Sequence, residues 1–304
     1  MKKITLLLLI SSSFLFASYI VPIPEIIKFD KEKALLGKKL FFDTRLSSTN
    51  TISCHTCHNL QSGGVDNLKF SFGVNGQEGN INTPTVLNAA LNFRQLWNGS
   101  VRTLAEQAKG PITNPKEMGH NIENIIKILK ADKIYIKLFK KLYKNGIVEE
   151  NILNALEEYE KTLITPNAPF DKYLKGNSKA ISEDAKQGYR LFIQKGCVSC
   201  HNGVNVGGNS FAKFGVVKQI SSQNFGLYDF TKEDMDKNFF KVPTLRNIAL
   251  TYPYFHHGEV ETLQEAIKIM ASSQMGITLT QKEIQQIEAF LKTLSGKIKG
   301  IDEY

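Results

Sequence analysis

The chain has 304 residues, enough for two domains of ordinary size, and a formal net charge of +9. Its lysines are spread along the sequence rather than clustered, so the charge gives no indication of nucleic-acid binding. The basicity fits either an acidic patch on a partner protein or a solvated surface.

A secretory signal peptide is predicted at the amino terminus. Lys2 and Lys3 precede an apolar run over residues 4–10, and Ser11-Ser12-Ser13-Phe14-Leu15-Phe16-Ala17 follows it. We expect cleavage after Ala17, which would remove residues 1–17, with an uncleaved anchor as the alternative. No later stretch reaches about 18 uninterrupted apolar residues, so we expect no stable membrane insertion of the mature chain. The predicted location is the periplasm or its equivalent.

The first predicted helix leads to the first haem-attachment signature. Asp30 can cap a helix that runs through Phe42. Beyond this helix lies Cys54-His55-Thr56-Cys57-His58, which has the form Cys-x-x-Cys-His. In that signature two thiols add to the vinyl groups of a haem, and the adjoining histidine becomes an iron ligand.

The middle of the chain is predicted to be helical. From Asn121 to Leu163 the apolar residues recur at helical spacing, in three helices broken near Ala131 and Gly146. The stretch 165–169 is rich in helix breakers, so it is the predicted crossing between two domains.

The second half of the chain begins as the first does. Ser182 starts a helix that leads to Cys197-Val198-Ser199-Cys200-His201, a second signature of the same form. All four cysteines of the chain lie in the two signatures. They predict two covalent haems, because a redox disulfide or a zinc site would not explain a histidine after both cysteine pairs. Thr280 and Glu283 form a capping box at the start of the last predicted helix.

The two halves repeat one pattern. Residues 84–91 align without gaps on residues 243–250, and the same register pairs Trp97 with His256. No segment alternates convincingly as a strand would. We therefore expect an all-α fold of two cytochrome-c-like haem domains related by internal duplication, with boundaries 18–165 and 166–304. Differences between the copies should reflect a division of labour.

The remaining iron ligands are not fixed by spacing. A haem with both axial positions filled by protein transfers electrons, whereas an open haem can bind peroxide. Besides His58 and His201, the candidate ligands are His55, His120, His256, His257, Met118, Met235, Met270 and Met275. A methionine thioether would raise the potential of its haem, but spacing alone does not choose among the methionines.

Further segments occur in a fixed order with the two signatures. They are Asn82-Thr83-Pro84-Thr85-Val86-Leu87-Asn88-Ala89, Leu96-Trp97-Asn98-Gly99, Glu106-Gln107-Ala108-Lys109-Gly110-Pro111, Glu117-Met118, Pro253-Tyr254-Phe255-His256-His257-Gly258 and Met270. With them the chain resembles the bacterial dihaem cytochrome c peroxidases, and the related dihaem oxidases typified by the enzyme that matures methylamine dehydrogenase. The resemblance covers nearly all of the mature chain.

The resemblance implies different roles for the two haems. The second haem, attached to Cys197 and Cys200, would be a high-potential electron entry site with His201 and Met270 as iron ligands. Met270 lies fourteen positions after His256, as in the family, and it replaces the tyrosine that the maturation enzyme has at this place.

The first haem would be the low-potential peroxide site, attached to Cys54 and Cys57 with His58 as its ligand. The resemblance places Gln107 and Glu117 in its distal pocket. A partly desolvated carboxylate can take a proton from one peroxide oxygen and return it to the other, while an amide can donate a hydrogen bond to the polarised oxygen but not a proton. Without the resemblance, both residues would be interpreted as ordinary surface groups.

The resemblance also assigns residues between the domains. Trp97, the only tryptophan, would relay electrons between the haems. Asn82, Thr251 and Pro253 match positions that hold a calcium ion, two of them through backbone carbonyls. The residues alone indicate calcium only weakly, since no cluster of carboxylates accompanies Asn82.

One position departs from the family pattern. In many members a histidine on the loop after the first haem closes the resting peroxide site, and the aligned residue here is Val74. An alkyl side chain cannot ligate iron. Asn75 would be a weak ligand, and His120 would have to come from another loop.

The predicted function is reduction of hydrogen peroxide to water with electrons from a small c-type cytochrome or a cupredoxin. The alternatives are a dihaem oxidase acting on a protein or a small organic substrate, and a non-enzymatic electron-transfer cytochrome. Met270 in place of tyrosine opposes the first alternative, and the second leaves Gln107 and Glu117 without a role. The sequence leaves open the identity of the donor, the haem potentials and whether the chain forms a homodimer.

Overall fold

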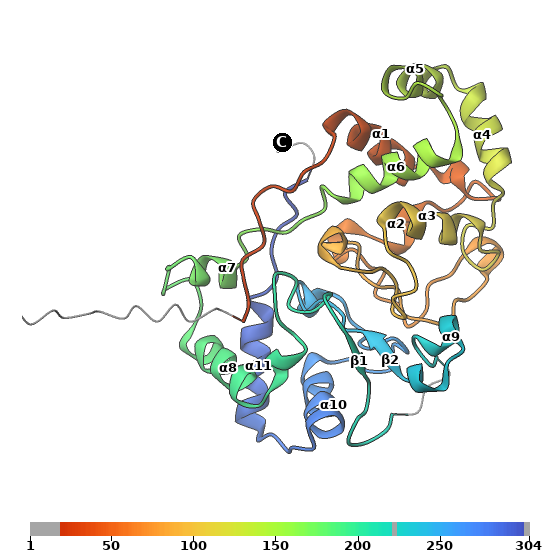
Figure 1. Ribbon diagram of the computed structural model, residues 1–304. Coiled ribbons are helices and arrows are strands. Elements are labelled where there is room, and N and C mark those ends of the chain that lie inside the picture. Colours follow the sequence, from red (N-terminus) through yellow and green to blue (C-terminus); the bar gives the residue numbers. More distant parts are fainter. Residues whose placement is uncertain (1–18, 221–223, 301–304) are drawn as a thin grey trace, which may run out of the picture.

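The computed structural model describes residues 19–220 and 224–300. The predicted signal peptide, residues 1–17, lies outside the described residues. Helices form two lobes, which extended segments connect (Figure 1). Within the described ranges, no helix is both long and apolar enough to cross a bilayer.

The N-terminal lobe is a helical bundle. Its helices are α1 (Lys31–Phe41), α2 (Cys54–Cys57), α3 (Leu104–Thr113), α4 (Ile122–Ala131), α5 (Lys133–Leu142) and α6 (Glu149–Glu160). The three helices predicted between residues 121 and 163 are confirmed, with breaks after Ala131 and around Gly146. The predicted cap is also present, because the Asp30 carboxylate accepts hydrogen bonds from the backbone N–H groups of Glu32 and Lys33, each at 3.1 Å.

The C-terminal lobe has the same helical character and adds a very small sheet. Its helices are α7 (Pro169–Leu174), α8 (Glu183–Gln194), α9 (Tyr228–Thr231), α10 (Leu263–Met275) and α11 (Gln281–Lys292). Strands β1 (Phe211–Lys213) and β2 (Phe239–Lys241) pair antiparallel, with Phe211 opposite Lys241. The expectation that no segment is a strand was wrong at these two places, because three residues are too few to show a period of two.

Short 3₁₀ helices complete the described structure. They are η1 (Thr44–Leu46), η2 (Leu60–Ser62), η3 (Val74–Gly76), η4 (Ala89–Leu91), η5 (Cys197–Ser199), η6 (Asp234–Asp236) and η7 (Ile248–Leu250). Each lobe has its own cluster of buried apolar side chains. The first is built mainly on α1, α4, α5 and α6, and the second mainly on α8, α10 and α11.

The helix pair at the centre of each lobe crosses at a glycine. α1 packs against α6, and α8 packs against α11. A Cβ atom at Gly37 would lie 1.8 Å from the carbonyl oxygen of Ala155, and one at Gly188 would lie 1.8 Å from that of Gln286. Only glycine allows backbones to approach this closely. Each glycine lies in the helix that leads to the haem-attachment signature of its lobe, so the two glycines have the same packing role.

Backbone geometry supports the internal duplication. Asn88 and Asn247 both adopt left-handed φ angles, of 60° and 61°. An isolated bridge pairs Gln95 with Val101 in the first lobe, and an equivalent bridge pairs Tyr254 with Val260 in the second. All three correspondences fall in the register that aligns residues 84–91 with residues 243–250.

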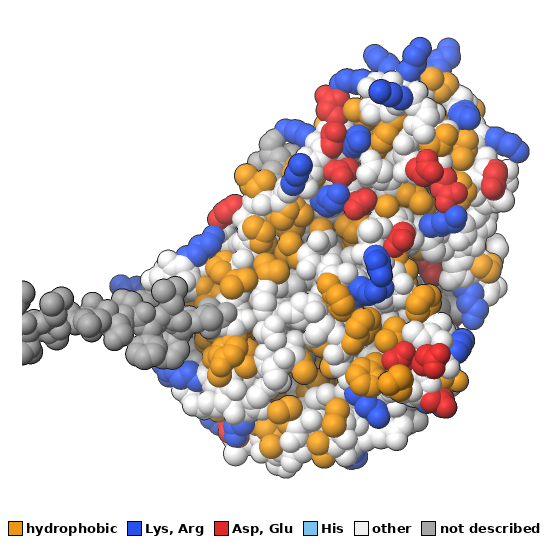
Figure 2. Space-filling model, in the orientation of Figure 1, with side chains coloured by type: hydrophobic (Ala, Val, Ile, Leu, Met, Phe, Trp, Pro, Cys, Tyr) orange, Lys and Arg blue, Asp and Glu red, His pale blue; other side chains and the backbone are white. Residues whose placement is uncertain are grey.

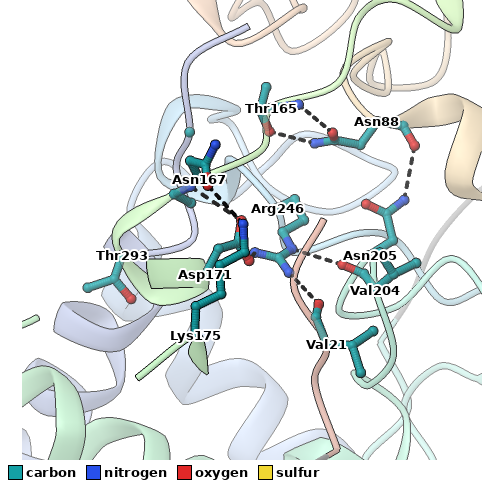
Figure 3. Close-up of polar contacts among 12 residues, drawn as sticks. Val21, Asn88, Thr165, Asn167, Asp171, Lys175, Val204, Asn205, Arg246 and Thr293 are labelled. Carbon is teal, nitrogen blue, oxygen red and sulfur yellow. Dashed lines mark hydrogen bonds and ion pairs between the residues drawn. The ribbon is translucent and has the colours of Figure 1, made fainter. Parts of the chain in front are cut away.

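The two copies meet at Thr165. The side-chain amides of Asn88 and Asn247 both donate to its Oγ1, at 2.9 and 3.1 Å. Asn88 Oδ1 in turn accepts from the Thr165 N–H at 2.9 Å, and Asn247 Oδ1 accepts from the Gly296 N–H at 3.0 Å. Figure 3 shows the Asn88 side of this junction. Equivalent asparagines thus share one hydroxyl group at the centre of the molecule.

A buried ion pair holds the start of the described chain against the C-terminal lobe. Arg246 and Asp171 have fully buried side chains, and Arg246 Nη1 lies 2.7 Å from Asp171 Oδ1. The same guanidinium donates to the carbonyls of Val21 and Val204, each at 2.9 Å (Figure 3). These bonds satisfy a cation that would otherwise be costly to bury.

The two ends of the described chain cross between the lobes. Ile20 is buried in the C-terminal core cluster and bridges to Gly203. Near the other end, Lys299 N–H donates to the Ile164 carbonyl, and Ile298 packs on the N-terminal core. Figure 2 shows lysine and arginine side chains distributed over the visible face among acidic and apolar ones, in agreement with the spread of lysines in the sequence.

Candidate functional site: two haem-attachment centres

A cavity of about 230 Å³ lies in the C-terminal lobe beside the second signature. Cys197, Cys200 and His201 line it, and Met270 on α10 contributes to the same wall. Met275 also lines the cavity, but its side chain is exposed, whereas Met270 is half-buried. The structure therefore brings the predicted ligand pair to one cavity, and the choice of Met270 over Met275 stays a prediction.

His201 has the properties of a neutral metal ligand. Burial lowers its pKa to about 4, and the carbonyls of Val206 and Pro243 oppose that shift. Its Nδ1 atom is buried and makes no hydrogen bond of normal geometry. A neutral imidazole is the form that binds metals. No disulfide joins any of the four cysteines, and burial raises the pKa of Cys197 to about 11. Reduced thiols, a neutral histidine and a thioether around one cavity fit a covalently attached haem.

The first signature forms helix α2 and the turn after it. His58 N–H donates to the Cys54 carbonyl at 3.0 Å, and His58 Nδ1 lies 3.2 Å from the Gly64 carbonyl oxygen. A hydrogen bond at one ring nitrogen orients the other toward a metal. Burial lowers the pKa of His58, and the contact with Gly64 opposes that shift. The geometry leaves Nε2 available for iron.

Gln107 and Glu117 belong to one helix-and-loop unit. Gln107 is half-buried on α3, and the loop after α3 folds back on the helix, where Met118 N–H donates to the Pro111 carbonyl at 3.0 Å. Glu117 Oε1 accepts from Asn114 Nδ2 at 2.7 Å.

Desolvation raises the pKa of Glu117, and the bond from Asn114 opposes this shift. The Glu117 side chain nevertheless keeps contact with solvent, which screens such a shift. That these two residues face the first haem stays a prediction.

Val74, at the start of η3, packs against the loop that carries Glu117. It is 3% exposed, and its N–H donates to the Glu117 carbonyl at 2.7 Å. A Cβ atom added at Gly119 would lie 2.9 Å from Val74 Cγ2, so the two loops are in close contact. His120 Nδ1 accepts from the N–H of Asn121 at 2.8 Å. The structure thus places an alkyl group, held by its neighbours, at the position where the family resemblance leads us to expect a histidine.

Trp97 lies between the lobes. Its indole N–H donates to the Asn82 carbonyl at 2.8 Å, and the Asn82 N–H donates to the His256 carbonyl at 2.8 Å. The rings of Trp97 and His256 are 6.1 Å apart, and His256 stacks on Phe240 at 4.2 Å. The two residues that the duplication pairs are therefore in contact, on the wall of the C-terminal cavity.

The proposed calcium residues also gather at this cavity. Asn82, Thr251 and Pro253 all line it. The Asn82 side-chain amide donates to the Leu68 and Lys69 carbonyls at 2.9 and 3.2 Å, which orients its oxygen away from them. Among the described residues, no group of three or more His, Cys, Asp or Glu side chains could hold a metal ion. A cation here would depend on amide and carbonyl oxygens, and its presence stays a prediction.

Lys241 and Glu160 are among the charged residues whose burial the sequence did not predict. Lys241, at the end of β2, is 6% exposed and lines the C-terminal cavity. Glu160, at the end of α6, is also 6% exposed, and burial raises its pKa to about 8. The repeat offered a signal for the first, because its register pairs Lys241 with Asn82, and unequal partners in a duplication mark divided roles.

Comparison with known proteins agrees with this geometry. A family model described as di-haem cytochrome c peroxidase matches residues 31–179, and a cytochrome c model matches residues 185–295. The chain is 46% identical over 280 residues to cytochrome c551 peroxidase of Nitrosomonas europaea, covering 91% of this chain and 84% of the relative. It is 42% identical over 290 residues to cytochrome c551 peroxidase of Pseudomonas aeruginosa, covering 91% and 84%.

Among solved structures, the fold is similar to that of a MauG-like protein associated with microbial copper homeostasis. The TM-score is 0.82 at 27% sequence identity, and the match covers 93% of this chain and 95% of that chain. The likeness extends over both lobes, so it includes both haem-attachment centres.

Proposed function

Because this chain belongs to the bacterial di-haem cytochrome c peroxidase family, we propose that it reduces hydrogen peroxide to water with electrons from a small redox protein. The observation that carries the proposal is the pair of complete haem-attachment signatures, one in each lobe of a duplicated fold. The donor would be a small c-type cytochrome or a cupredoxin, and the predicted signal peptide places the reaction in the periplasm.

The residues assign each haem a place. Cys54 and Cys57 would attach the first haem, with His58 as its iron ligand. The second would be attached at the cavity by Cys197 and Cys200, with His201 and Met270 as ligands. When bound, the haems supply the redox chemistry, storing electrons at one iron and reducing peroxide at the other.

Proton transfer is the task of the protein. Glu117 would take a proton from one peroxide oxygen and return it to the other. Desolvation raises its pKa, which brings it closer to the operating pH and improves its ability to act as both base and acid. Gln107 would donate a hydrogen bond to the polarised oxygen and thereby fix its position.

Trp97 would relay electrons between the two haem sites. Its contacts join both lobes: it donates to Asn82, which lies in the N-terminal half, and its ring contacts His256 in the C-terminal half. The calcium ion, held by Asn82 with Thr251 and Pro253, would stiffen the same junction. Both assignments rest on the family pattern together with the location of these residues at one cavity wall.

The two alternatives predict different behaviour. A dihaem oxidase would turn over an organic or protein substrate, and Met270 in place of tyrosine disfavours that reading. An electron carrier would have protein ligands on both faces of both irons, whereas Val74 supplies none at the first haem.

The test is a steady-state assay of the haem-loaded protein with hydrogen peroxide and a reduced small cytochrome. We expect oxidation of two donor molecules for each peroxide consumed, because the reduction of peroxide to water takes two electrons. Absence of peroxide-dependent donor oxidation with both cytochrome and cupredoxin donors, in protein that carries two haems, would reject the proposed function.

A further inference from the structure

Lys241 is a buried lysine on the wall of the C-terminal cavity. It is 6% exposed, and among the described residues we find no side-chain hydrogen bond or ion pair to its ammonium group. Lysines are almost never buried unless they are paired, since removing an ammonium ion from water costs several kcal/mol. The cavity is therefore expected to receive a group that carries the opposite charge.

The charged residues on the cavity wall also favour an anionic occupant. Three lysines line it, and within the described chain no aspartate or glutamate does. Lys195 forms an ion pair with Glu283, with 2.7 Å between Nζ and Oε1, and Lys213 is exposed to solvent. Lys241 alone is both buried and unneutralised. Burial lowers its pKa to about 8, with no neighbouring charge opposing the shift.

The backbone fixes Lys241 at the junction of the lobes. Its N–H donates to the Trp97 carbonyl at 2.9 Å, and pairing with Phe211 holds it in the β1–β2 sheet. The preceding residue, Phe240, stacks on His256 at 4.2 Å. An anion bound by Lys241 would therefore lie on the side of the cavity that adjoins Trp97.

We propose that the Lys241 ammonium group binds a propionate carboxylate of the haem attached at Cys197 and Cys200, and so raises the reduction potential of that haem. This proposal rests on the proposed function, because it takes the group bound in the cavity to be a c-type haem. A haem brings two carboxylates to an otherwise apolar site, and the wall offers no protein carboxylate instead. A fixed positive charge favours the reduced iron, which carries one positive charge fewer.

The duplication makes this charge specific to one haem. The position equivalent to Lys241 in the first copy is Asn82, whose amide is neutral and already donates to the Leu68 and Lys69 carbonyls. The same place in the repeat thus holds a cation in one lobe and a committed amide in the other. Lys241 acts as a positioning residue that helps to separate the two potentials.

The experiment compares Lys241→Met with two controls in the haem-loaded protein. Lys241→Arg keeps the charge, and Lys213→Met removes an exposed charge from the same cavity wall. A pyridine haemochrome assay first establishes two haems per chain. Spectroelectrochemical titration then gives the midpoint potential of the C-terminal haem, and redox-difference infrared spectroscopy detects any protonated propionate through its carboxylic-acid C=O band.

We expect Lys241→Met to lower the midpoint potential, or to produce a carboxylic-acid band that the parent lacks if the unpaired propionate takes up a proton. Both controls should stay near the parent. The proposal is overturned if Lys241→Met shows neither change, or if Lys213→Met shifts the potential as much. Should Lys241→Met fail to mature, Lys241→Gln gives the same comparison.

These readouts do not depend on turnover. A parent protein without peroxidase activity would reject the proposed function and leave the potentials measurable. An unchanged potential and no new carboxylic-acid band in Lys241→Met, together with intact turnover, would reject only the role of Lys241.

Discussion

Single residues distinguish the two copies of the repeat. Where the first lobe has Trp97, the second has His256, and the two side chains meet at the junction. Where the first has Asn82, the second has Lys241. The register of the repeat pairs these positions, so side chains of different chemistry occupy corresponding places in the two copies. A duplicated unit can divide its labour in this way with few substitutions.

Glu117 is the residue on which peroxide chemistry is expected to depend. Glu117→Gln keeps the shape of the side chain but removes its ability to shuttle a proton. General acid–base catalysis is commonly worth about two to four decades in rate, so we expect peroxide turnover to fall by about 10²–10⁴. Glu123→Gln, an exposed glutamate at the start of α4, is the matched control. Turnover of Glu117→Gln within about threefold of the parent would remove Glu117 from the mechanism.

Met270 is expected to be the thioether ligand of the second haem. Met270→His should lower the potential of that haem and leave the spectrum of the first haem unchanged, because imidazole stabilises ferric iron better than a thioether does. Met275→Leu serves as the control, since Met275 lines the same cavity. An unchanged potential in Met270→His, with a changed one in Met275→Leu, would transfer the ligand role to Met275.

Glu160 should make folding stability depend on pH. Its pKa is raised from 4.5 to about 8 in the folded protein, mainly by burial. Because the folded protein favours the neutral carboxyl group, the contribution of Glu160 to folding stability is fully present below pH 4.5. This contribution is lost as the pH rises toward 8. At about 1.4 kcal/mol per pKa unit, the loss is roughly 5 kcal/mol at most.

Glu160→Gln removes this titration. Denaturant unfolding at several pH values should show the variant gaining stability relative to the parent as the pH rises from about 4.5 to 8. The comparison between the two proteins cancels the contributions of other titrating groups. A difference in stability that does not change across this range would show that Glu160 is not a buried titrating acid.

At the scale of elements, local sequence signals located the helices well. Asp30 caps α1, Ser182 caps α8 through its bond with the Ala185 N–H, and Thr280 with Glu283 forms the capping box of α11. Caps depend on side chains three residues away or fewer, so they can be read from sequence. The β1–β2 pair depends on residues almost thirty positions apart, and three-residue strands carry no pattern of their own.

In the candidate site, too, local features could be predicted from the sequence and features that depend on tertiary packing could not. The haem signatures are contiguous in sequence, so both attachment centres were predictable. The burial of Lys241 was not, because a lysine is normally a surface residue even between apolar neighbours, and packing of its strand against the Trp97 loop buries it. The burial of Glu160 likewise comes from the tertiary packing of α6, within an otherwise ordinary helix end.

The close helix crossing in each lobe gives a stability prediction. Gly188→Ala would place a Cβ atom 1.8 Å from a backbone oxygen of α11, so the helices must move apart. We expect a loss of unfolding free energy of about 1–3 kcal/mol or more, as for other overpacked interiors. Gly110→Ala, in α3, is the control, because no atom lies within 4 Å of its Cβ and alanine favours helices. Equal unfolding free energies of the two variants in denaturant would contradict the close backbone contact of α8 and α11 at Gly188.

At the scale of the whole molecule, the duplication forms one body with a shared centre. Equivalent asparagines bond to the same Thr165 hydroxyl, and each end of the described chain packs on the opposite lobe. Trp97 and His256 also meet at the junction of the two lobes, on the wall of the C-terminal cavity. This arrangement suits electron transfer, which depends on a fixed separation between centres.

We propose that the two copies of one haem domain do different work: the second haem would have two protein ligands, and the first would have an open face for peroxide. Val74 supplies no ligand, and its packing against the Glu117 loop holds it in place. Electron paramagnetic resonance of the fully oxidised protein tests this directly. We predict a high-spin ferric signal from the haem on His58 beside one low-spin signal from the His/Met haem. Two low-spin signals with no high-spin fraction would contradict the account.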